Sequence, residues 1–174
     1  LNKGKKDYNS EIQHYSAVSL NSIENKINSE LNNLQNKYQK RKSINVLEQI
    51  IEKYKKYLES NLLDKASIEI FNSEYIKYLK EYNDNFGSDY TYEYELAKAY
   101  IRADRLKKAI NIIDDLIKLD KNILKAYILK LKILYIQNDY KKLRETIKIL
   151  KKDGIINQLS KDSKLYKKIQ FWID

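Results

Sequence analysis

Apolar residues recur every three or four positions along most of this chain, which is the spacing of one face of an α-helix. In the first half the pattern predicts one helix over about residues 20–42, a second beginning near Ser43 and a third from about Asp64 to Asn83, with a break at Ser60-Asn61. Their apolar faces are Ile23, Ile27, Leu31, Leu34 and Tyr38; Leu47, Ile50, Ile51, Tyr54, Tyr57 and Leu58; and Ile68, Phe71, Tyr75, Ile76, Leu79 and Tyr82.

The second half has regular punctuation between its apolar segments. Gly87 is expected to end the third helix, since glycine tolerates the left-handed conformation at a helix C-terminus. Residues suited to helix N-termini then recur before further segments: Ser88 or Asp89, Asp104, Asn122 and Asp139. Asp153-Gly154 closes the last of these, and a shorter amphipathic helix is expected over about Leu159 to Trp172.

Composition agrees with an all-α fold. The chain of 174 residues has no proline, three glycines and 43% hydrophobic residues, so it can bury a core but lacks the punctuation of strands and tight turns. We expect a flexible polar leader at residues 1–19, an N-terminal helical segment at 20–87 and a helical repeat domain at 88–174.

A shift of 34 residues superimposes the apolar positions of two helix-turn-helix segments. Five of six pairs are apolar in both copies; the pairs are Leu96/Lys130, Ala97/Leu131, Tyr100/Leu134, Ala109/Leu143, Ile113/Ile147 and Leu116/Leu150. A 34-residue helical hairpin resembles the tetratricopeptide repeat family, here over residues 90–157. A generic helical bundle with an accidental period is the alternative.

The resemblance assigns packing roles to the first copy. The family motif of a small residue, an aromatic, a second small residue and two apolar positions is matched by Ala97, Tyr100, Ala109, Ile113 and Leu116. Glu93 and Lys121 depart from the family pattern, in which Trp and Pro are usual. The second copy carries Leu131 and Leu143 at the small positions and Lys130 at an apolar one, so we expect its helices to splay further apart. The last helix would cap the final apolar face.

In this family the first helices of successive repeats line a concave groove that binds a partner protein. The resemblance therefore implies a peptide or helix of another protein as ligand, at Tyr94, Lys98, Ile101, Arg102, Lys125, Ile128, Leu129, Lys132, Tyr135 and Ile136. The alternative is that another helix of the same chain, such as Ser22–Lys42, packs on these residues.

Excess positive charge is concentrated near the C-terminus. Residues 121–174 carry 14 basic and five acidic side chains, and so hold nearly all of the chain's net charge of +10. The predicted basic patch is Lys141, Arg144, Lys148, Lys151 and Lys152. Such a run is most often a solvated helix face. An anionic partner or membrane surface is the next interpretation, nucleic acid is disfavoured because few aromatic residues are interleaved, and self-association through Ser22–Leu58 is a further alternative.

Nothing in the sequence indicates catalysis, a cofactor or a metal site. There is no cysteine, the single histidine (His14) lies in the polar leader, and the adjacent Asp114 and Asp115 diverge around a helix instead of forming a pair. No apolar run is long enough to span a membrane. The polar leader and the absence of a starting methionine favour a bacterial cell envelope, periplasmic or membrane-anchored, over the cytoplasm.

Overall fold

The structure is a computed structural model that describes residues 22, 24–60, 62–121, 123–158 and 164–173. Every regular element among these residues is a helix, which confirms the all-α prediction. The chain divides into two compact units, Leu1–Phe86 and Gly87–Asp174. The predicted leader at 1–19 with His14 lies outside the described residues, as do Ile23, Asn61, Asn122, Leu159 and Lys161.

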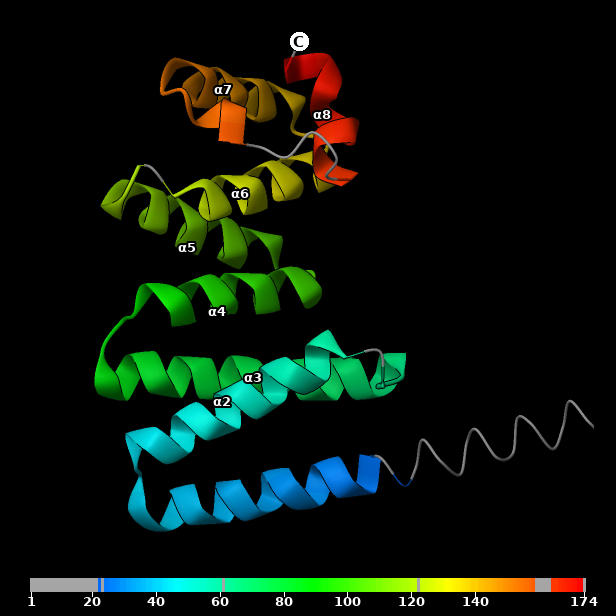
Figure 1. Ribbon diagram of the computed structural model, residues 1–174, viewed down its shortest axis with the longest axis vertical. Coiled ribbons are helices and arrows are strands. Elements are labelled where there is room, and N and C mark those ends of the chain that lie inside the picture. The colour runs from blue at the N-terminus through cyan, green and yellow to red at the C-terminus, as the bar shows by residue number, and fades with distance from the viewer. Residues whose placement is uncertain (1–21, 23, 61, 122, 159–163, 174) are drawn as a thin grey trace, which may run out of the picture. The chain divides into compact units, whose positions relative to one another are not determined.

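The first unit contains a helix over residues 24–41, α2 (Ile44–Glu59) and α3 (Lys65–Phe86). Each of these helices runs antiparallel to the one that precedes it (Figure 1). The described residues of the predicted apolar stripes are buried or half-buried. Tyr54 of α2 meets the rings of Phe71 and Tyr78 of α3 at centroid distances of 5.6 and 5.8 Å. Glu30 binds α2 from the first helix, accepting from Lys53 Nζ at 2.7 Å and Tyr57 Oη at 2.9 Å.

Helix ends in this unit follow the predicted punctuation with one difference. Ser43 is the N-cap residue of α2, and Asp64 accepts a bond from the backbone N–H of Ser67 at 2.7 Å beside the start of α3. Helix α3 continues to Phe86, beyond the predicted end at Asn83. It stops at Gly87, whose φ of 92° lies in the left-handed region that glycine adopts without strain.

The second unit repeats its helix boundaries. Its elements are α4 (Tyr90–Arg102), α5 (Leu106–Leu119), α6 (Leu124–Ile136), α7 (Tyr140–Lys152), the 3₁₀-helix η1 (Ile155–Gln158) and α8 (Lys164–Ile173). Adding 34 to the bounds of α4 (90 and 102) yields those of α6 (124 and 136), and adding 34 to the start of α5 (106) yields that of α7 (140). Helices α4 to α7 form successive antiparallel hairpins (Figure 1).

The two hairpin turns share one backbone geometry. Asp104 and Asn138, which are 34 residues apart, have φ values of 54° and 56°. The next residue in each turn donates its N–H back into the preceding helix, Arg105 to the carbonyl of Tyr100 at 2.8 Å and Asp139 to that of Leu134 at 3.0 Å. These bonds satisfy carbonyls at the helix C-termini. Helix α4 ends at Arg102 with Ala103 as its C-cap residue, Asp104 lies in the turn, and the N-cap residue of α5 is Arg105.

The motif positions form the core of the hairpins. Each of the five motif residues and its equivalent 34 positions later is buried. The backbones of α4 and α5, with Ala97 and Ala109, lie within 8 Å over more of their length than those of α6 and α7, with Leu131 and Leu143. The wider separation in the second hairpin is the one predicted from its larger side chains.

Helix α8 covers the end of the second hairpin. Ile169 and Ile173 are buried in one cluster with residues of α6, α7 and η1: Tyr127, Leu131, Leu134, Leu143, Ile147, Leu150 and Ile155. The predicted terminal helix is therefore confirmed for residues 164–173, where it shields apolar side chains that α6 and α7 leave uncovered.

Opposite changes of side-chain size at the equivalent positions 109 and 143 should both destabilise the unit. Leu143→Ala should lower the free energy of unfolding by about 2–5 kcal/mol, because it leaves a cavity in a fully buried site. Ala109→Leu should cost about 1–3 kcal/mol by forcing α4 and α5 apart. Urea unfolding followed by circular dichroism measures both changes.

The matched controls are Lys107→Ala and Lys141→Ala, which are exposed on the same two helices and should stay within about 0.5 kcal/mol of the wild type. A Leu143→Ala protein as stable as these controls would contradict the packing of the second hairpin.

Candidate functional site

The predicted groove residues occupy equivalent positions on α4 and α6. Four pairs are separated by 34 residues: Tyr94/Ile128, Lys98/Lys132, Ile101/Tyr135 and Arg102/Ile136. Because the two helices belong to repeated antiparallel hairpins and contact each other, equivalent side chains lie in register on one side of the pair. The residues that the sequence indicated thus lie on two neighbouring helices of one unit.

On α4 the candidate residues form a small aromatic and charged cluster. The Tyr94 ring stacks on that of Tyr90 with centroids 6.1 Å apart, and Lys98 Nζ lies 5.9 Å from the centre of the Tyr94 ring. The same ammonium group binds the buried Glu95 carboxylate at 2.9 and 3.1 Å. Lys98 is therefore held in place, while Arg102 at the end of α4 is exposed and Ile101 is half-buried.

On α6 the candidates differ in exposure. Lys125, Lys132 and Ile136 are exposed, Ile136 to 47%, and Ile128 and Tyr135 are half-buried. Leu129 retains only 7% of its surface and offers little to a ligand. The available surface on α6 therefore consists of two cations and one isoleucine, with a tyrosine at its edge.

Helix α8 packs beside two of the candidate residues. Ile128 and Tyr135 lie against the apolar cluster that contains Ile169 and Ile173, and Lys168 Nζ is 5.4 Å from the centre of the Tyr135 ring. Sequence reasoning allowed for a helix of the same chain at these positions, and α8 is such a helix. The candidate surface is consequently narrowed at its α6 end.

The lysine that interrupts the apolar repeat pattern has a specific partner. Lys130 Nζ binds Asp114 Oδ1 at 2.6 Å and so joins α6 to α5, with 23% of the lysine side chain exposed. The neighbouring Asp115 binds Lys118 one turn later at 2.8 Å. Sequence reasoning noticed Lys130 as a departure but did not pair it. The sequence feature that could have indicated this ion pair is Asp114, a carboxylate on the preceding helix α5.

The predicted basic patch is exposed throughout. Lys141, Arg144, Lys148, Lys151 and Lys152 all lie on the side of α7 away from its buried residues. Lys142, also exposed, binds the N-cap residue Asp139 at 3.2 Å. Hydrogen bonds from the Lys142 backbone and side chain, together with the nearby lysine charges, hold the pKa of Asp139 below its usual value. This carboxylate is therefore charged at neutral pH and stabilises the start of α7.

The described part of the chain contains no group of three or more His, Asp or Glu residues arranged to hold a metal ion. Among the same residues, no helix is both long and apolar enough to cross a membrane. Compared with protein-family models and with curated proteins, the sequence matches none.

The environment of Tyr94 predicts a measurable titration. Burial first, and the Glu95 carboxylate second, raise the pKa of Tyr94 above the ordinary value of 10.0. Its contribution to stability is therefore complete below pH 10 and is lost as the pH rises through the higher folded-state value. The difference in tyrosinate absorbance between the wild type and Tyr94→Phe should report this raised pKa.

Glu95→Gln separates the two causes. It should lower the pKa of Tyr94 without restoring the ordinary value, because burial remains the larger effect. If Tyr94 instead titrates like a free tyrosine, its ring is solvated and does not pack against α4 as described.

Proposed function

We propose that the second unit is a non-catalytic, tetratricopeptide-like interaction module, and that the shared face of α4 and α6 binds a segment of another protein. The observation that supports this most strongly is the 34-residue repetition of helix bounds, turn geometry and buried positions in α4 to α7. Repetition of this kind presents the same face of successive helices to one side, which forms an extended surface suited to an extended ligand.

The chemistry of the face indicates the ligand class. Exposed cations at Arg102, Lys125 and Lys132 lie among the partly exposed apolar side chains of Ile101 and Ile136. Apolar contacts would supply most of the affinity, and the cations would select acidic side chains flanking them. An amphipathic helix or extended peptide with acidic residues beside its apolar anchors fits this arrangement.

A paired charge reversal tests the groove without disturbing the core. In Arg102→Glu/Lys132→Glu both changes are on exposed positions of α4 and α6, so the fold should survive. Binding to an acidic partner segment should weaken by at least about tenfold, since two attractive contacts become repulsive. Pull-down from a lysate of the source organism, followed by calorimetry with each purified candidate, provides the measurement.

The matched control is Lys107→Glu/Lys141→Glu, which makes the same change in net charge at exposed positions of α5 and α7. A genuine groove ligand is retained by the control and lost by the groove variant. Equal retention of every captured protein by both variants would refute the proposed binding face, whereas circular dichroism identifies any variant that fails to fold.

A further inference from the structure

The C-terminal helix has an outer face that its packing role does not use. In α8, Ile169 and Ile173 are buried, whereas Phe171 is 86% exposed. Lys164, Lys167 and Lys168 precede Phe171 by seven, four and three residues and therefore lie on the same helix face as it does, opposite the buried isoleucines. A large aromatic side chain thus stands in solvent on the same helix face as three exposed lysines, all of which precede it in α8.

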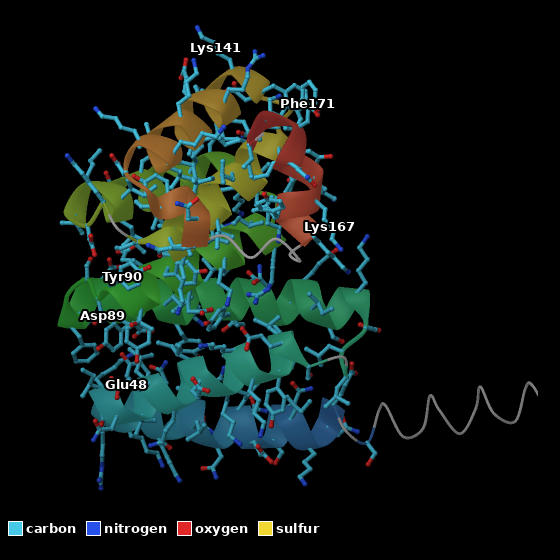
Figure 2. The ribbon with its side chains drawn as sticks, turned by 45° about the horizontal axis from the view of Figure 1, so that its top comes forward. Glu48, Asp89, Tyr90, Lys141, Lys167 and Phe171 are labelled. Atoms are coloured by element: carbon cyan, nitrogen blue, oxygen red, sulfur yellow. The ribbon has the colours of Figure 1, made fainter. Side chains whose placement is uncertain are left out.

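This face continues onto the basic patch of α7. The rings of Tyr140 and Trp172 stack at a centroid distance of 5.2 Å with 14° between their planes. Their chain neighbours are Lys141 and Phe171, so the stacked pair brings the start of α7 next to the end of α8. Figure 2 labels Lys141 on α7 and Phe171 and Lys167 on α8. Phe171 also meets the Trp172 ring edge-on, with centroids 5.8 Å apart.

The charge on this joint surface is almost entirely of one sign. Helix α7 carries six basic residues and one acidic residue, and α8 carries three basic residues and none that is acidic. By contrast α4 has two of each. Eight of the nine cations on α7 and α8 are lysines. Lysine acts as a point charge, which suits a diffuse layer of anionic headgroups better than bidentate recognition of an individual phosphate.

We propose that α7 and α8 dock on the anionic surface of a phospholipid bilayer, with Phe171 inserted among the acyl chains and the lysines at the headgroups. Two attractions act together: the lysines draw the protein to the negative surface potential, and insertion removes the exposed aromatic ring from water. Nucleic acid fits less well, because the bases would require several free aromatic faces, and Tyr140 and Trp172 are stacked on each other. This proposal is independent of ligand binding by α4 and α6.

The chain contains its own probe of insertion, since Trp172 is the only tryptophan and adjoins Phe171. The full-length protein should cosediment with phosphatidylcholine vesicles that contain phosphatidylserine and not with phosphatidylcholine alone. On binding to the anionic vesicles, the fluorescence emission of Trp172 should shift to the blue and be quenched by lipids brominated on the acyl chains. Binding should fall steeply as salt is added, because the attraction between lysines and headgroups is screened.

Two variants separate charge from insertion. Lys164→Ala/Lys167→Ala should weaken vesicle binding by roughly fivefold for each lysine. Phe171→Asn should abolish quenching by the acyl-chain bromines. Their controls are Lys107→Ala/Lys121→Ala, which loses the same charge from α5 and the turn that follows it, and Leu119→Asn, which removes an 83% exposed apolar side chain from the end of α5. Both controls should bind and be quenched as the wild type is.

Three results would overturn the proposal. One is undiminished vesicle binding by Lys164→Ala/Lys167→Ala. Another is acyl-chain quenching that persists in Phe171→Asn, and the third is stronger binding to a single-stranded oligonucleotide than to the anionic vesicles at equal salt. The last outcome would assign the surface to nucleic acid instead.

Discussion

The second unit depends on one constraint, which is that helices of 13 or 14 residues cannot persist alone and must bury an apolar stripe against a partner. Ala97 and Ala109 satisfy it by allowing α4 and α5 to approach closely along their length. The turn at Asp104 directs the second helix back along the first, and the same turn recurs at Asn138. Once one hairpin has formed in this way, the next can stack on it in the same register.

The junction between hairpins also resolves the one polar interruption in the repeat. Lys130 lies at the position equivalent to Leu96, which is buried in the first hairpin. Its ammonium group donates a hydrogen bond to the Asp114 carboxylate. A half-buried cation without this partner would carry a desolvation cost. The ion pair thus lets α5 and α6 pack with the lysine in place. It also joins the two hairpins by a directional polar contact, in addition to their apolar packing.

The helices of the fold could be predicted because their signals are local. Spacings of three and four residues, capping residues and a glycine stop located the α-helices, with errors at ends such as Phe86 and Arg105. The short 3₁₀-helix η1 was not predicted. The candidate groove could be predicted only as a set of helix positions. Which of these side chains are accessible to a ligand could not be predicted, because the burial of Leu129 and the packing of Tyr135 beside α8 depend on tertiary packing.

By itself the sequence determined that the chain is helical, that two segments repeat after 34 residues and that the positive charge accumulates near the C-terminus. Each of these follows from the order and spacing of residue types. Only the tertiary structure decided which side chains remain available. Phe171 and Ile173 are both apolar and two residues apart, yet one is exposed and the other is buried. That difference arises because α8 packs on α6 and α7 through one face alone, and no local pattern specifies where the packing partner lies.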